Sequence, residues 1–276
     1  MTEQQTPAVP LRPRSVIILM LASAAGLLAF GWPLLVDPGA ALDDVTVAPL
    51  VLAVVLLGVT AAVMVDFGDG GLDVRAVAIL GLLAAVGAVL RPLSAGAAGI
   101  ETVFVLVVLG GRVFGAGFGF ILGATTLFAS ALLTGGIGPW LPFQMLGAAW
   151  IGLGAGLLPR RVNRYWEIAM LAIYGAIAAL GFGLAMNLSF WPFQLGLGTD
   201  LSFLPGAAAG ENLRRFFLFS LATSLGWDIG RAITTIVGVV LVGPVTLPIL
   251  RRAATRARFV PAPRPRHQPT AEAGQA

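Results

Sequence analysis

Several apolar runs in this sequence are long enough to cross a membrane, and they constrain the fold more than any other feature. The runs at residues 16–36, 47–65, 113–133 and 168–188 contain no charged residue. About 20 apolar residues in a helix cross the roughly 30 Å of hydrocarbon in a bilayer. Apolar residues make up 58% of the chain and charged residues 11%, against roughly 45–50% and 25% in soluble domains. The sequence therefore predicts an all-α integral membrane protein.

Shorter or interrupted runs bring the expected number of spans to about eight. They lie at residues 76–90, 102–109, 143–158 and 216–250. The run at 76–90 is expected to end at Arg91-Pro92, because proline ends a helix. The run at 216–250 exceeds one crossing, so it is divided into a surface or lid helix before Trp227 and a span after it. The first run is interpreted as a retained helix, because it lacks a signal-peptide cleavage site followed by a soluble domain.

Four regions follow from this pattern. We expect a disordered cytoplasmic head at 1–14, two N-terminal transmembrane helices at 15–70, a membrane core at 71–258 and a disordered cytoplasmic tail at 259–276. With eight spans, Arg12, Arg14 and the arginine clusters at 160–164 and 251–258 share one side. The positive-inside rule then makes both termini cytoplasmic in a bacterial cell membrane. Arg91, Arg214 and Arg215 depart from this rule, which indicates either that they serve a local purpose or that the predicted number of helices near them is wrong.

The composition argues against most enzymatic chemistry. There is no cysteine, which excludes thiolate metal sites and thiol catalysis. The only histidine, His267, lies in the polar tail, so neither a transition-metal site nor a Ser-His-Asp triad is expected. The net charge of +4 comes from arginines at helix ends and in the tails, as membrane topology requires, and nucleic-acid binding is not expected. We expect no catalytic residues, no metal and no cofactor.

A helix-breaking loop at residues 135–142 carries the first candidate ligand contacts. The stretch G-G-I-G-P-W-L-P-F-Q-M includes Gly138, Trp140, Phe143 and Gln144. Irregular backbone at membrane depth is tolerated only where it lines a cavity or is buried in protein. Two aromatic faces and one amide suit a ligand with a ring system. The alternative is an interfacial tryptophan anchor on a tight turn.

The second candidate segment is residues 189–212, which we name the lid segment. It is aromatic and rich in Gly and Pro, too apolar for a solvated loop and too broken for a helix. Amides and aromatics interleave at its start, and the same predicted extracellular face holds the 135–142 loop. A shared pocket is therefore predicted, with stacking from Trp140, Phe143 and Trp191 and polar contacts from Gln144, Asn187 and Gln194.

Charged residues inside apolar segments form the third set of candidates. Asp228 and Arg231 stand three residues apart on one helix, and Glu101 and Glu167 also lie in or near apolar segments. Such charges are costly in a membrane and are usually paired or functional. Asp228 and Arg231 are included among the predicted substrate contacts, although they could simply neutralise each other. A proton-coupled carrier using Glu101 and Asp228 remains an alternative, although the chain shows no matching inverted halves.

The helix at 76–90 has small residues four apart, Ala84 and Ala88. This spacing allows another helix to pack closely, so the pair is a candidate partner contact. Ordinary packing within the chain is the alternative.

Together these motifs resemble the substrate-binding S components of energy-coupling factor (ECF) vitamin transporters. The resemblance rests on the Ala84/Ala88 helix, the glycine-rich run at 111–123, the G-P-W-L-P-F-Q-M loop and the W-D-I-G-R segment. It implies a six-helix core that binds a vitamin extracellularly and pairs with a transmembrane T component and two cytosolic ATPases. The two N-terminal helices are additional to this pattern. The chain has no phosphate-binding P-loop, as expected if another subunit hydrolyses ATP.

The resemblance leaves the ligand open. Cobalamin is the first candidate, and riboflavin, thiamine, biotin and queuosine-like bases remain candidates. A proton-coupled secondary transporter is the second hypothesis, and a membrane scaffold without transport activity is the third.

Overall fold

The computed structural model describes residues 11–35, 48–69, 74–94, 99–194 and 198–256. The acidic turn at 37–44 and the predicted tail lie outside these ranges, as does most of the predicted head. Every regular element in the described ranges is a helix. In chain order the elements are α1 (Pro13–Phe30), η1 (Trp32–Leu34), α2 (Ala48–Asp69), α3 (Val74–Ser94), α4 (Val103–Phe114), α5 (Ala116–Thr134), α6 (Leu141–Leu157), α7 (Arg164–Gln194), α8 (Ala209–Thr223) and α9 (Leu225–Arg256).

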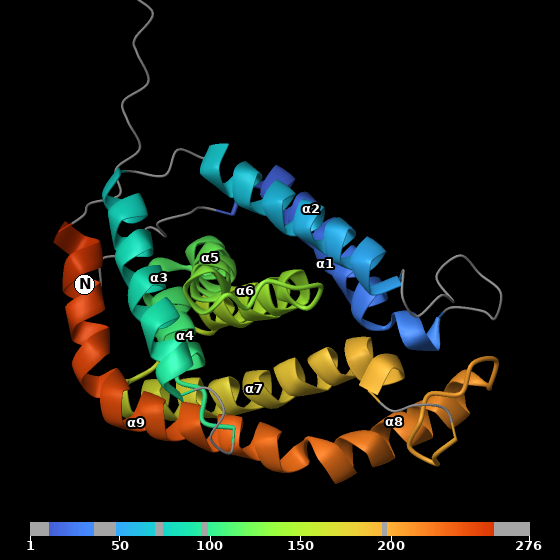
Figure 1. Ribbon diagram of the computed structural model, residues 1–276. Coiled ribbons are helices and arrows are strands. Elements are labelled where there is room, and N and C mark those ends of the chain that lie inside the picture. Colours follow the sequence, from blue (N-terminus) through green and yellow to red (C-terminus); the bar gives the residue numbers. More distant parts are fainter. Residues whose placement is uncertain (1–10, 36–47, 70–73, 95–98, 195–197, 257–276) are drawn as a thin grey trace, which may run out of the picture.

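Helices α5 and α6 form the centre of the molecule, with the other helices around them (Figure 1). Their axes approach closely because glycines face each other across the contact. A Cβ at Gly119 or Gly123 would collide with backbone atoms of Gly152 or Ala148 on α6, and one at Gly152 would collide with Gly119. Small residues four apart allow this close approach between membrane helices. The glycine-rich run at 111–123 therefore has a structural role in the core.

The outer helices turn apolar side chains outward, as a bilayer requires. Within the described ranges, six helices are long and apolar enough to span a membrane: α1, α2, α3, α5, α7 and α9. In five of them only 28–33% of the span is buried in the protein, whereas α5 is 72% buried. Helices α4 and α6 are apolar but shorter. This surface and these lengths establish an all-helical, multi-pass membrane protein.

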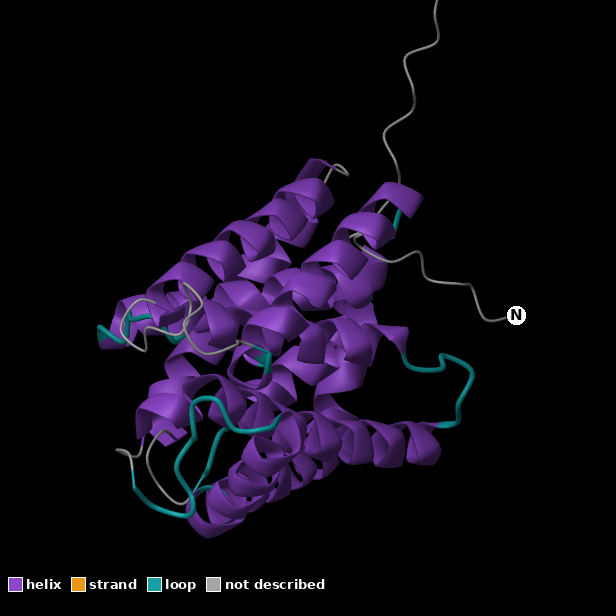
Figure 2. Ribbon diagram, turned by 90° about the vertical axis from the view of Figure 1, so that its right-hand side faces the viewer, coloured by secondary structure: helices purple, strands orange, loops and turns teal. Residues whose placement is uncertain are grey.

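Interactions between helix ends show that the core helices alternate in direction. The end of α3 and the starts of α6 and α9 meet around Glu101, which precedes α4. The end of α4, the start of α7 and the end of α9 meet around Glu167. The connecting loops lie at the periphery of the helices (Figure 2). The molecule therefore has two polar ends separated by an apolar middle.

Three predicted boundaries are wrong because proline is tolerated near a helix end. Helix α3 continues past Arg91-Pro92 to Ser94, so Pro92 occupies its last turn. Pro142 lies in the first turn of α6, where its missing N–H has no helical partner to lose. Pro192 lies inside α7, which runs on to Gln194 and includes the first six residues of the lid segment. The lid segment is thus less broken than the sequence indicates.

Two further elements refine the predicted pattern. The short stretch at 102–109 extends through Phe114, and Gly115 separates α4 from α5 with a φ of +101°. That left-handed backbone favours glycine. The division of the run at 216–250 is confirmed, although the break lies at Ser224, before Trp227. Helix α9 contains Pro244 and Pro248, and it bends towards its C-terminal end (Figure 1), as proline predicts.

Candidate functional site

A largely buried network of charged side chains joins α3, α6, α9 and the segment before α4 at one end of the core. Arg231 of α9 donates to Glu101 at 2.7 Å and to Asp228 at 2.7 Å. Glu101 also pairs with Arg91 of α3 at 3.6 Å, and Arg91 donates to the Oε1 of Gln144 on α6 at 3.1 Å. The two arginines balance the two carboxylates, which is how a protein retains charges in a low-dielectric interior.

The neighbouring backbone is shaped to admit this network. A Cβ at Gly183 of α7 would overlap the Asp228 carboxylate and crowd the Arg231 guanidinium, so a larger residue there would displace this ion pair. The guanidinium of Arg231 lies 5.5 Å from the centre of the Phe182 ring, within the range of a cation–π contact. Asp228 and Arg231 are both buried. They pair at i, i+3, which is the alternative that the sequence left open beside a substrate contact, and Glu101 is their third partner.

Asn187 lies beside this network. Its Nδ2 donates to the Oγ of Ser224, in the break between α8 and α9, one turn before Asp228. Four predicted polar contacts, Gln144, Asn187, Asp228 and Arg231, therefore lie at the same end of the core. They come from α6, α7 and α9, which are far apart in sequence. The side chain of Gln194 lies outside the described residues.

The predicted stacking residues do not share one cavity in this conformation. Trp191 is fully buried against Phe203, Phe216 and Phe219, and its Nε1 donates to the Leu201 carbonyl at 2.7 Å. Phe143 is also buried, and its ring makes edge-on contacts with the rings of Phe30 and Phe190. The sequence could not reveal these contacts, because they depend on how α1 and α8 pack.

Trp140 differs from the other two stacking candidates in being 46% exposed. Its ring lies against Gly138, where a Cβ would collide with the indole. The absence of a side chain at Gly138 therefore allows the Trp140 ring to pack against the backbone. The exposed ring fits either a ligand contact or an interfacial anchor, the two alternatives that the sequence left open.

Polar contacts fasten the described part of the lid segment to α8. Asn212 accepts from the Leu204 N–H and donates to the Leu204 carbonyl, both at 3.0 Å. Arg215 donates to the Thr199 carbonyl at 3.2 Å and pairs with Glu211 at 2.8 Å. Hydrogen bonds from Arg214 and then Arg215 hold the pKa of the exposed Glu211 carboxyl below its ordinary value of 4.5. The Glu211 hydrogen bond in turn raises the pKa of Arg214.

The N-terminal elements also contact this end of the core. Trp32 of η1 donates from Nε1 to the Ser189 carbonyl at 3.1 Å and stacks on Phe193, with ring centres 5.6 Å apart. Trp150 of α6 donates to the Oγ of Ser23 in α1 at 3.1 Å. Sequence reasoning did not single out Trp32. The G-W-P break at 31–33, at the end of an apolar run, is the signal that could have found it.

A second buried ionic cluster lies at the opposite end of the core. Arg112 of α4 pairs with Glu167 of α7 at 2.6 Å and donates to the carbonyls of Leu158 and Pro159 at 3.0 and 2.9 Å. Arg251 of α9 binds both oxygens of Glu167 at 2.6 and 2.8 Å. Arg112 was not among the predicted residues, although an arginine inside an apolar run is itself a signal of pairing.

The small residues Ala84 and Ala88 are buried within the chain, at 3% and 1% exposure. Beside them, a Cβ at Gly87 would meet side chains of α4 and α5, those of Leu106 and Thr126. This face of α3 therefore packs inward, as the alternative of packing within the chain requires. The outward face of α3 includes Ala78, Gly81 and Ala85.

Comparison with protein families identifies most of the helical core. Residues 75–250 match the family model described as "ECF transporter, substrate-specific component", which covers more than half of the chain. The match begins at the start of α3, includes the network around Glu101 and the lid segment, and leaves α1 and α2 outside; of the second ionic cluster it includes Arg112 and Glu167 and ends one residue before Arg251. No curated protein and no solved structure matches the chain. The chain therefore belongs to the family of ECF transporter substrate-specific components, which are transport subunits.

Proposed function

We propose that this protein is the substrate-specific subunit of an ECF-type importer that binds a vitamin-like micronutrient on the extracellular side. Its partners are a transmembrane T component and two cytosolic ATPases, which drive uptake by hydrolysing ATP. One observation carries the assignment of the site. The Arg91–Glu101–Arg231–Asp228 network holds Gln144 at the end of the core where α7 runs into the lid segment, and this core belongs to the family.

We place the ligand between the Gly138–Gln144 stretch and the residues Asn187–Gln194. Trp140 offers an open ring face there, and Gln144 and Asn187 carry amides that suit polar edges of a ligand. Trp191 lies under the later part of the lid segment, the loop at 198–208, so its proposed stacking role requires that loop to move away from α7. Asp228 and Arg231 bind each other in this conformation and would exchange part of that pairing for ligand contacts.

Cobalamin is our first candidate ligand. Its broad ring and amide side chains suit a site with large aromatic faces and several amides. Riboflavin, thiamine, biotin and queuosine-like bases have smaller rings with polar edges, and they belong in the same binding screen.

The proposed topology has eight spans with both termini in the cytoplasm. The six long helices and the shorter apolar helices α4 and α6 give this number. The arginine clusters near residues 160–164 and 251–256 then lie on the cytoplasmic side, and the candidate ligand site lies on the extracellular side. Helices α1 and α2 are the two additional N-terminal spans of this proposal.

A calorimetric screen of purified protein against this vitamin panel tests the ligand. For the vitamin that binds, Trp140→Ala should weaken affinity about tenfold or more, because an aromatic contact typically contributes more than 1 kcal/mol. Trp166→Ala is the matched control, because Trp166 is exposed and begins α7 at the other end of the core. Equal affinity of wild type and Trp140→Ala for the vitamin would indicate that Trp140 is an interfacial anchor and not a ligand contact.

A proton-coupled carrier is the second candidate function, because Glu101 and Asp228 are carboxylates in or near apolar segments that share Arg231. Uptake by vesicles containing the complete transporter distinguishes the two functions. We expect uptake to require ATPase activity of the partners and to survive collapse of the proton gradient at constant ATP. Uptake that stops with the gradient, and continues with catalytically inactive ATPases, would favour the secondary carrier.

A further inference from the structure

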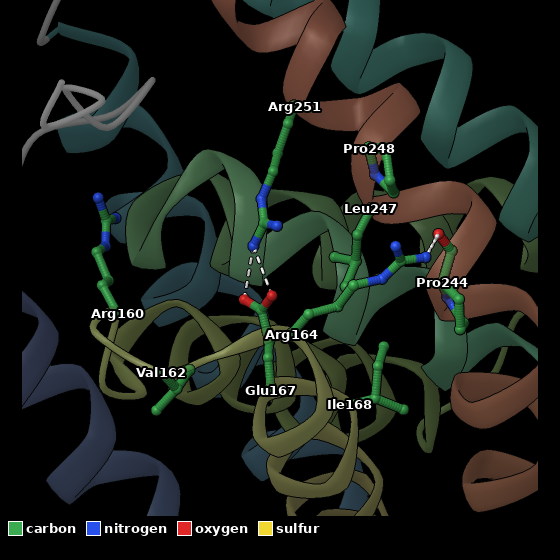
Figure 3. A pocket seen from close by; sticks show the side chains of 9 residues that line it. All are labelled: Arg160, Val162, Arg164, Glu167, Ile168, Pro244, Leu247, Pro248 and Arg251. Carbon is green, nitrogen blue, oxygen red and sulfur yellow. Dashed lines mark hydrogen bonds and ion pairs between the residues drawn. The ribbon is translucent and has the colours of Figure 1, made fainter. Parts of the chain in front are cut away.

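A cavity of about 330 Å³ lies at the end of the core opposite the candidate ligand site. The loop before α7, the first turn of α7 and the C-terminal part of α9 surround it. Its charged lining consists of Arg160, Arg164, Arg251 and Glu167, and side chains such as Ile168 and Leu247 complete it. Figure 3 shows Arg251 reaching from α9 onto Glu167, with Arg160 and Arg164 on either side of that carboxylate in the view.

The lining carries more positive than negative charge. Glu167 is its one carboxylate, and this residue already binds two guanidiniums, those of Arg251 and the buried Arg112. Arg164 donates to the Pro244 carbonyl at 3.5 Å. That carbonyl has no helical donor because Pro248, four residues on, lacks an N–H. A neutral carbonyl does not cancel the charge of Arg164, so the cavity is suited to an anion.

The surroundings of the cavity point to the headgroup layer of a membrane. Tyr165 and Trp166 directly follow Arg164 and are 87% and 69% exposed, as aromatics at a membrane interface are. From this point α7 runs for 31 residues, about 45 Å at 1.5 Å per residue, which exceeds the hydrocarbon thickness. The cavity therefore opens beside lipid headgroups, with apolar helix surface adjoining it.

We propose that this cavity binds the phosphate group of an anionic phospholipid. Arg160 and Arg164 contact the phosphate, and Glu167 holds Arg251 in position. Arginine clusters between transmembrane helices recognise lipid phosphates through paired N–H donors. A free phosphate ion offers the same oxygens, so the experiment has to separate the two sources. The proposal concerns the end of the core opposite the vitamin site and does not depend on the proposed function.

Native mass spectrometry of the full chain with added lipid tests this proposal. Titrations compare phosphatidylglycerol with zwitterionic phosphatidylcholine, and separate arms add inorganic phosphate or glycerol 3-phosphate as competitors. The double variant Arg160→Gln/Arg164→Gln should bind phosphatidylglycerol roughly thirtyfold more weakly, at about fivefold for each arginine. The control Arg161→Gln/Arg252→Gln removes the same charge from exposed positions outside the cavity lining, and its affinity should stay within about twofold of wild type.

A second variant tests the contribution of the cavity's space separately from the contribution of its charge. Val162→Trp fills the cavity from its lining without changing any charge, and we expect it to weaken phosphatidylglycerol binding as well. It also decides the question if the double arginine variant does not fold, as judged by its melting temperature without lipid. Equal losses in the lining and control pairs would overturn the proposal in favour of general surface charge. Competition by millimolar free phosphate, or unchanged binding to Val162→Trp, would also overturn it.

Discussion

The indole Nε1 of Trp191 donates a hydrogen bond to the carbonyl of Leu201 at 2.7 Å, which ties the end of α7 to the loop before α8. Phe203, Phe216 and Phe219 surround the same ring. Trp191 is thus the α7 residue on which the later part of the lid segment, the loop at 198–208, packs. That loop can uncover the α7 surface beneath it only if these contacts break.

Trp191→Phe should loosen the loop at 198–208 while an aromatic ring still fills the space between Phe203, Phe216 and Phe219. The variant keeps an aromatic ring and removes the N–H donor, leaving the Leu201 carbonyl without this partner at a cost of about 1–3 kcal/mol. We expect faster amide hydrogen exchange at residues 199–205, measured in detergent by mass spectrometry. Trp166→Phe, at an exposed position, is the control. Unchanged exchange in Trp191→Phe would show that ring packing alone holds the segment.

The Arg231–Glu101 ion pair should matter more for folding than any exposed ion pair of this protein. Arg231→Met leaves Glu101 and Asp228 without their shared partner, and breaking a buried pair typically costs about 3–5 kcal/mol. Thermal unfolding in detergent should show a large drop in melting temperature. The control Arg214→Met removes an exposed pair with Glu211, which is typically worth about 0–1 kcal/mol.

A double-mutant cycle tests whether Arg231 and Glu101 are coupled. Glu101→Gln/Arg231→Met should be less destabilised than the sum of its single variants, because the second change removes a charge that the first left unpaired. Strict additivity would contradict this expectation. It would indicate that water or another cation compensates each charge separately.

Gly119→Ala should disrupt the centre of the core. Its new methyl group would collide with the Gly152 carbonyl, and the contact is backbone, so no side chain can turn aside. We expect poor yield or a melting temperature many degrees lower than that of wild type. Gly181→Ala is the control, because that glycine has open space at its Cβ position and alanine favours helix by about 1 kcal/mol. A stable Gly119→Ala variant would mean that α5 and α6 can separate at little cost.

The sequence predicts the helices better than it predicts what their side chains do. Apolar length alone locates the spans, because nothing else explains runs of that length without charge. The helix ends near Pro92 and Pro192 depend on whether one lost hydrogen bond is tolerated, which neighbouring helices decide, whereas Pro142 in the first turn of α6 loses none. Sequence signals therefore misplace these boundaries by several residues.

The sequence likewise predicts only part of the candidate site. Asp228 and Arg231 could be paired from their i, i+3 spacing, but Glu101 is 130 positions from Arg231 and joins the pair only through the fold. Nothing in the sequence indicates that the aromatic side chains of Phe143 and Trp191 are buried. Their burial depends on α1 and α8, whose packing a single sequence does not reveal.

The last prediction concerns Ala84 and Ala88, which we propose as the contact for the T component. If a partner helix packs there during transport, Ala84→Leu/Ala88→Leu should abolish ATP-driven uptake by the complete transporter. Vitamin binding by the isolated subunit should remain within about twofold of wild type, since neither alanine is a proposed ligand contact.

Because both alanines are buried, the alternative hypothesis that they only pack within the chain predicts a different result. Extra methylenes in a packed interface cost about 1–3 kcal/mol, so residues that only fill the core would lower the melting temperature, binding and uptake together. Ala85→Leu is the matched control, because Ala85 neighbours Ala84 on the same helix and is exposed. If Ala85→Leu alone stopped uptake while binding stayed intact, the T component would contact the outward face of α3. In that case Ala84 and Ala88 would only set the position of α3 against α4 and α5.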